Sequence, residues 1–108
     1  MVLEQKRAGY DLIKIHGDFS REAFHRLMEA AHRDGLKVIG HAPRNLGVGP
    51  MFEEHMDAVA HGEEFLYAFF FFGTPDLSQA DPAIRQRFLE SAEQRIPELA
   101  RATATADT

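Results

Sequence analysis

The sequence predicts an α/β fold with parallel strands. Three short segments of strand-like composition, residues 10–15, 36–41 and 57–61, alternate along the chain with segments of helical periodicity. This alternation is typical of successive βαβ units, in which right-handed crossovers make the strands parallel. A chain of 108 residues has room for one domain, which we expect to span residues 1–102, followed by a disordered tail at 103–108.

The strands are predicted from short apolar segments that end at chain breakers. Residues 10–15 are rich in aromatic and β-branched side chains and lie between Gly9 and Gly17, while residues 36–41 end before Pro43. Residues 57–61 contain fewer apolar side chains. We assign them as the third strand because they follow one or two expected helical turns at residues 50–56.

The helices are predicted from capping residues and apolar stripes. Ser20 is an expected N-cap, and the apolar stripe behind it stops before Gly35. The apolar run at residues 65–72 follows two glutamates that favour a helix N-terminus. Asp81 and Pro82 are typical of another helix start, and Pro97 should kink or break the helix that follows.

Composition excludes several classes of function. Twelve basic and seventeen acidic residues leave a net charge of -5, so we expect neither nucleic acid nor anionic membranes as partners. The longest apolar run has eight residues, whereas a spanning helix needs roughly 20. The first residues lack the apolar core of a secretion signal, which favours a cytoplasmic location. Since cysteine is absent, a metal ion would need other ligands.

Three side chains suited to a metal site lie at or just beyond strand ends: Lys14, His41 and His61. In parallel folds the C-terminal ends of the strands form one edge, where ligands bind. Two imidazoles and a third donor are the minimum for an open zinc-type site, in which the metal activates a water molecule. A neutral lysine amine is a poor ligand, and strand-end histidines are commonly packing residues, so spacing alone leaves both interpretations open.

Candidates for proton transfer lie next to these residues. Glu63 follows His61 by two positions, and His16 follows Lys14 by two. A glutamate in the first turn of a helix also stabilises the helix dipole, and His16 could instead orient a neighbouring ligand.

Three ordered motifs carry a family resemblance. They are residues 10–18 around Lys14, residues 40–43 around His41, and residues 60–64 around His61. Together they resemble the middle of a metal-dependent amidohydrolase of the imidazolonepropionase and prolidase type. The resemblance implies units four to six of a (β/α)₈ barrel, with about three parallel β-α units and a C-terminal helix in this chain.

The resemblance also implies a ligand set and a reaction. Lys14 corresponds to a lysine that carbon dioxide converts into a metal-bridging carbamate, and His41 and His61 correspond to two histidine ligands of one ion. The family uses divalent metals, commonly Zn²⁺, to hydrolyse amide, ester or related bonds of small molecules. We therefore expect a metal-dependent hydrolase acting on a small-molecule substrate, with Glu63 or His16 in proton transfer.

Parts of the family pattern are missing. No two histidines are two residues apart, and the family's last aspartate would lie beyond residue 108. A full barrel needs about 250 residues, so one chain cannot close it. The exposed strands would then need a partner, which favours a homo-oligomer, with residues 69–72 as a seam or as a helix packed on the chain's own sheet. The alternative function is a non-catalytic fragment or assembly subunit.

Overall fold

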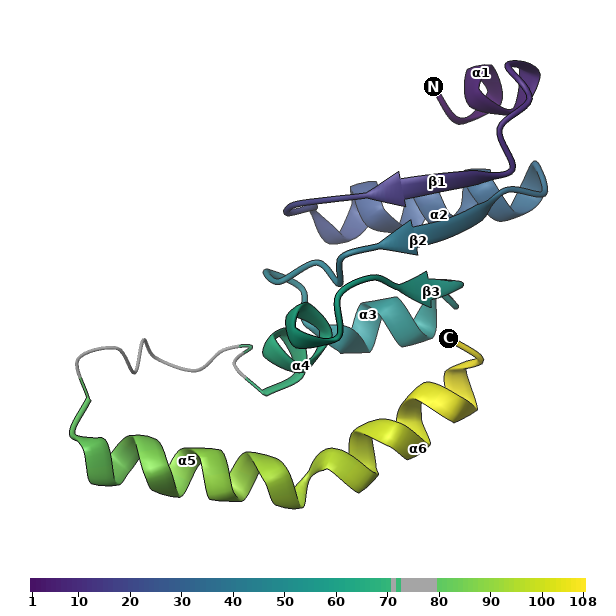
Figure 1. Cartoon of the computed structure of the whole chain (residues 1–108). Coiled ribbons are helices and arrows are strands. Elements are labelled where there is room, and N and C mark those ends of the chain that lie inside the picture. Colours follow the sequence, from purple (N-terminus) through teal and green to yellow (C-terminus); the bar gives the residue numbers. More distant parts are fainter. Residues whose placement is uncertain (71, 73–79) are drawn as a thin grey trace.

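A parallel three-stranded sheet is the centre of the fold. The computed structural model describes residues 1–70, 72 and 80–108, with the main chain only at 63, 64, 66 and 67. The strands lie in the order β1-β2-β3 and span Leu12–Ile15, Lys37–Gly40 and Ala58–Val59 (Figure 1). The expected α/β class with parallel strands is confirmed, although each strand is shorter than predicted.

Six helices accompany the sheet in the described part of the chain. They span Val2–Arg7 (α1), Arg21–Arg33 (α2), Val48–Glu53 (α3), Gly62–Phe70 (α4), Pro82–Gln94 (α5) and Ile96–Ala106 (α6). The sequence analysis did not predict α1, a six-residue helix without a buried side chain. Within the described residues, no helix is both long and apolar enough to span a membrane.

Helix α2 forms where its capping residue predicts. The Ser20 hydroxyl accepts a hydrogen bond from the Ala23 amide at 3.1 Å, which satisfies one of the free N–H groups of the first turn. The helix ends at Arg33, and Gly35 follows with a φ of 70° that favours glycine. Its buried residues, Phe24, Met28 and Ala31, lie three and four positions apart and so form one stripe.

The hydrophobic core lies between this stripe and one face of the sheet. Ile15 of β1 and Val38 of β2 are buried there, and Met51 and Met56 extend the core toward α3. Side chains alternate along a strand, so Leu12 and Lys14 of β1 lie on the opposite face. Both are exposed, with Leu12 retaining 47% of its accessible surface. The sheet is therefore covered on one face and open on the other.

Helices α5 and α6 form an arm along one side of the molecule (Figure 1). Asp81 caps α5 by accepting a hydrogen bond from the Ala83 amide at 2.7 Å, and the expected break occurs between Gln94 and Ile96. Helix α6 continues to Ala106, so residues 103–106 of the expected tail are helical. The arm makes the molecule elongated, with a radius of gyration of 15.8 Å against about 13 Å for a compact chain of this length.

The phenylalanine-rich segment packs mainly inward as far as it is described. Phe65 and Phe69 of α4 contact the core, and the Arg95 guanidinium lies 4.6 Å from the centre of the Phe69 ring. Phe72 is 54% exposed, and Phe71 lies outside the described residues. Helix α4 thus contacts the core and α3, while packing on the sheet and a seam between copies both stay predictions.

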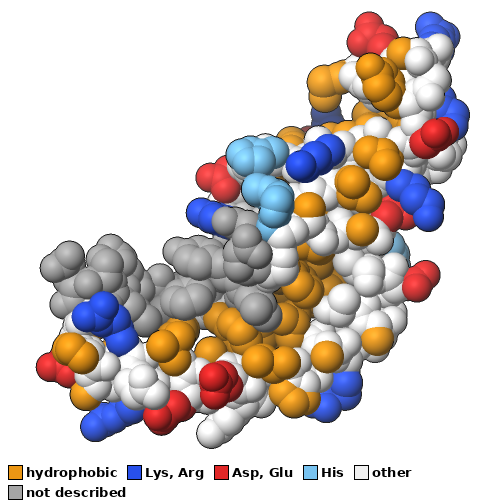
Figure 2. Space-filling view, in the orientation of Figure 1, with side chains coloured by type: hydrophobic (Ala, Val, Ile, Leu, Met, Phe, Trp, Pro, Cys, Tyr) orange, Lys and Arg blue, Asp and Glu red, His pale blue; other side chains and the backbone are white. Residues whose placement is uncertain are grey.

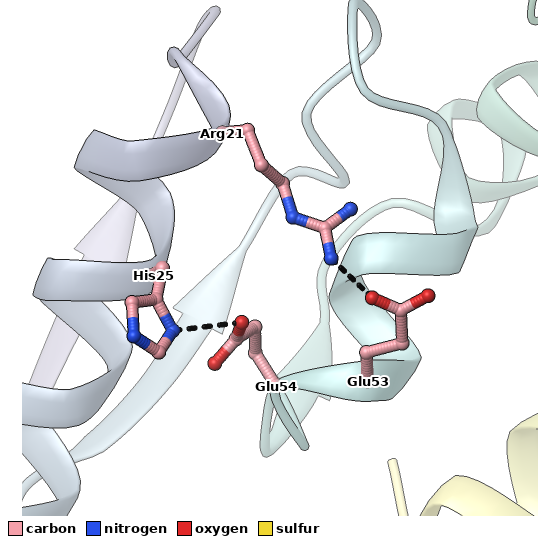
Figure 3. A network of polar contacts seen from close by, with 4 residues as sticks. All are labelled: Arg21, His25, Glu53 and Glu54. Atoms are coloured by element: carbon pink, nitrogen blue, oxygen red, sulfur yellow. Dashed lines mark hydrogen bonds and ion pairs between the residues drawn. The ribbon is translucent and has the colours of Figure 1, made fainter.

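Polar contacts join α2 to α3 on the molecular surface. Arg21 forms an ion pair with Glu53, and His25 Nδ1 lies 2.9 Å from Glu54 Oε1 (Figure 3). The two pairs lie side by side and bridge helices far apart in the sequence. Because three of the four side chains are more than half exposed, these pairs contribute less than about 1 kcal/mol each.

Candidate histidine site at the end of the sheet

Three histidines form a row where the parallel strands end. His16 follows β1, His41 follows β2, and His61 comes two residues after β3. The ring centres of His16 and His41 are 4.4 Å apart, and those of His41 and His61 are 5.0 Å apart. Figure 2 shows histidine side chains gathered at this end of the sheet. The rings of His41 and His61, two of the three residues predicted as metal ligands, are therefore in contact, whereas Lys14, the third, is not part of this row.

The register of the strands explains why His16 and His41 are neighbours. Ile15 pairs with Gly40 and Gly40 with Val59, so the next residues in line are His16, His41 and Ala60, and His61 follows Ala60. The His41 amide continues the ladder by donating to the Ile15 carbonyl at 3.2 Å. Gly40 makes this close pairing feasible, since its φ is 135° and an added Cβ would lie 2.1 Å from the Ile15 oxygen.

His61 has an unusual backbone conformation. Its φ of 61° is in the left-handed region, which residues other than glycine rarely adopt. The residue turns the chain from β3 into α4 and brings its ring perpendicular to that of His41, at an interplanar angle of 90°. His55 and Asp107 have similar φ values of 54° and 57°, so this conformation is not confined to the histidine row.

A cavity of about 330 Å³ opens beside His16 and His41. It is lined by the two loops that leave β1 and β2, including Asp18 and Arg44. Asn45 holds these loops together, because its side chain donates to the Phe19 carbonyl at 2.6 Å and accepts from the Phe19 amide at 3.3 Å. Sequence reasoning missed Arg44, although a cationic residue three positions after a candidate ligand is a usable signal.

The other candidate residues lie in different places. Lys14 is in β1, opposite Ile39, and lines a second hollow along the outer edge of β1, where His16 also contributes. Glu63 belongs to the first turn of α4, but its side chain lies outside the described part of the structure. The structure thus brings together His16, His41 and His61, and it places Lys14 on the neighbouring strand surface.

The ring separation of His41 and His61 matches both an edge-to-face aromatic pair and two imidazoles that share a metal ion. Two imidazoles that share a tetrahedral ion at about 2.0 Å have ring centres about 5 Å apart, and those of His41 and His61 are 5.0 Å apart. Among the described residues, no three His, Asp or Glu side chains are grouped so that they could hold a metal ion.

Asp57 forms a separate polar cluster at the opposite edge of the sheet. Its Oδ2 accepts a hydrogen bond from the Val38 amide at 2.8 Å and lies 3.0 Å from His32 Nε2. Burial raises the pKa of the Asp57 carboxyl, but the hydrogen bonds from Val38 and His32, with the charges of His32 and Lys37, outweigh it and hold the pKa below its usual value. Because the cluster joins α2 to the strand starts, we assign it a structural role.

Comparisons with known proteins leave this site without a named relative. No protein-family profile, curated protein or solved structure matches the chain.

Proposed function

We propose that this chain is a metal-dependent hydrolase of amide or ester bonds and that His41 and His61 bind its divalent metal ion. The observation that carries the proposal is the perpendicular pair of imidazoles, 5.0 Å apart, at the C-terminal edge of a parallel sheet. Zn²⁺ suits such a site because it accepts imidazole nitrogen readily. We also propose that the three strands correspond to part of a (β/α)₈ barrel, on the basis of their parallel order.

Lys14 is the proposed third donor, in its carboxylated form. It lies on the same face of β1 as His16, two residues before it, and its long side chain can lean along the strand toward the histidine row. Carboxylation would change the cationic amine into an anionic oxygen donor, which divalent ions accept. When bound, the ion would polarise the substrate carbonyl and lower the pKa of a water molecule.

His16 is proposed to move the proton. In hydrolysis the water oxygen forms a bond to the acyl carbon, and the carbon–nitrogen or carbon–oxygen bond breaks. The His16 imidazole would accept the proton of the water and return it to the leaving amine or alcohol. Its ring lines the cavity beside His41, whose volume of about 330 Å³ is at the lower end of ligand sites and suits a small-molecule substrate.

Calorimetric titration with Zn²⁺ and a hydrolysis assay test the proposal. We expect one equivalent of Zn²⁺ to bind, and hydrolysis of a nitrophenyl ester or a nitroanilide to stop when a chelator removes the ion. His41→Ala and His61→Ala should each lose Zn²⁺ binding and activity. His25→Ala is the matched control, since His25 lies on the exposed surface of α2 beside Glu54 and should bind and react as the parent does. Zn²⁺ binding that survives both site substitutions would refute the proposed metal centre.

A non-catalytic assembly subunit is the second candidate function. It is favoured by apolar side chains that the chain leaves about half exposed, among them Leu12 of β1 and Ile84, Leu89 and Ile96 of the α5–α6 arm. In this case the chain would form a homo-oligomer. Light scattering would show a particle larger than 12.2 kDa, and the protein would bind metal without turnover. A monomer that hydrolyses substrate would exclude this candidate.

A further inference from the structure

The outer edge of β1 has main-chain groups that the sheet does not use. The Lys37 amide donates to the Asp11 carbonyl, and the His41 amide donates to the Ile15 carbonyl, each at 3.2 Å. In residues 11–15 the odd-numbered residues therefore direct their main-chain N–H and C=O groups toward β2. Because the direction alternates along a strand, Leu12 and Lys14 direct theirs away from the sheet. Water can solvate these groups, but another extended backbone matches their spacing and can pair with the whole row.

A groove follows the same edge. It has a volume of about 660 Å³ and lies among α1, β1 and α2. Its walls are mainly apolar and include Val2, Tyr10, Leu12, Ile13, Phe19 and Leu27. Tyr10 and Leu12 are 57% and 47% exposed, so large apolar surfaces face solvent beside the outward main-chain groups of Leu12. The Tyr10 amide itself donates to the Gln5 carbonyl at 3.2 Å. An extended segment with alternating apolar side chains would cover both features.

The charge of the groove differs from that of the chain. The chain carries seventeen acidic residues and a net charge of -5, yet none of the described residues that line this groove is acidic, and Lys14 contributes a cationic group. An acidic side chain on a bound segment would therefore find a partner of opposite charge there. A second copy of β1 would bring another Lys14 to the edge and is less complementary.

We propose that the outer edge of β1 binds an extended peptide segment as an additional strand, with apolar side chains in the groove and an acidic side chain near Lys14. Main-chain hydrogen bonds would give the affinity, and the apolar walls and Lys14 would give the selectivity. The site borders the proposed metal centre, because His16 lines both hollows and Lys14 is also the proposed third metal donor. Peptide binding uses Lys14 as the free, cationic amine, so it belongs to the chain without metal and without carboxylation.

Fluorescence anisotropy with a labelled, blocked hexapeptide of sequence Val-Thr-Val-Glu-Val-Thr tests the proposal. The full chain is used without added metal, so that binding is measured independently of hydrolysis. In an extended peptide the odd-numbered and even-numbered amides point to opposite sides. One derivative is N-methylated at the odd-numbered residues and the other at the even-numbered residues. Only one set can face β1, so one derivative should bind about tenfold more weakly and the other nearly as well as the parent peptide. Equal binding of both, or equal loss in both, would overturn strand addition.

Variants of the chain test the same contact from the other side. Leu12→Pro removes an outward N–H without removing a bond to β2, and it should weaken peptide binding while circular dichroism stays unchanged. The parent chain should bind the glutamate peptide more tightly than a peptide with lysine in its place, by up to about fivefold in affinity. Lys14→Glu should reverse this preference. Arg87→Glu on α5 makes the same change in charge far from the groove and should leave that preference unaltered. A preference that survives Lys14→Glu, or dimerisation that blocks the peptide, would refute the proposal.

Discussion

Asp57 and Val38 hold each other through two hydrogen bonds at the edge of the sheet opposite the histidine row. The Asp57 carboxylate accepts from the Val38 amide at 2.8 Å, and the Asp57 amide donates to the Val38 carbonyl at 3.0 Å. The Asp57 side chain thus extends the hydrogen bonding between β2 and the two-residue strand β3. The bond from His32 adds the end of α2 to the same contact.

Asp57→Asn should destabilise the chain by about 1–3 kcal/mol at pH 7, because the bonds from Val38 and His32 lose their charged acceptor. Urea denaturation followed by circular dichroism measures the change. An effect below about 0.3 kcal/mol would show that β3 does not depend on this carboxylate.

The same carboxyl should make stability depend on pH. Its folded-state pKa lies below the usual value of 3.8, so the unfolded chain binds its proton more readily. The ionised Asp57 carboxyl therefore makes its full contribution to the free energy of unfolding above the unfolded pKa. This contribution is lost as the pH falls below 3.8 through the folded pKa. In Asp57→Asn the loss of stability between pH 6 and pH 3 should be smaller than in the parent. Equal slopes in the two proteins would contradict this assignment.

Gly40→Ala should unfold or strongly destabilise the chain, by more than about 3 kcal/mol. The new Cβ would lie 2.1 Å from the Ile15 carbonyl oxygen, and the φ of 135° is unfavourable for alanine. Gly9→Ala is the matched control. Gly9 also has a positive φ, 87°, but no atom within 4 Å of an added Cβ, so strain alone should cost about 1 kcal/mol. Thermal melts that show equal losses would indicate that β1 and β2 are less closely packed here.

Asn45→Ala should loosen the two loops that line the cavity. It removes both hydrogen bonds to the Phe19 main chain, and we expect a loss of about 1–2 kcal/mol in stability. Hydrogen exchange should show faster exchange at the Phe19 amide. Gln86→Ala, which removes only the surface contact with Glu90 within α5, should change stability by less than about 0.5 kcal/mol.

Zn²⁺ should stabilise the folded chain in a way that depends on His41. At a free concentration one hundred times the dissociation constant, a ligand that binds only the folded state adds about 2.7 kcal/mol. The melting temperature should rise with Zn²⁺ in the parent and in His25→Ala, remain unchanged in His41→Ala, and fall back when a chelator is added. A Zn²⁺-induced rise in His41→Ala would place the ion elsewhere.

Local signals in the sequence determined the class of fold and most of the elements. Ser20 and Asp81 cap α2 and α5 through their own side chains, and Pro97 lies just after the break between α5 and α6. These interactions join residues only two or three positions apart, so a single sequence contains all the information they need. Strand ends were predicted less accurately, because strand length depends on pairing with neighbours.

The tertiary structure alone decided how the chemical groups meet. Lys14, His16, His41 and His61 were all candidates from their positions near strand ends. The register of β1 and β2 placed His16 beside His41, the turn after β3 brought His61 to His41, and Lys14 came to line the groove at the edge of β1. The bond from the Asp57 carboxylate to Val38 spans nineteen positions and has no local pattern. Such contacts depend on how separate elements pack, because side-chain distances across a sheet follow from register and not from spacing along the chain.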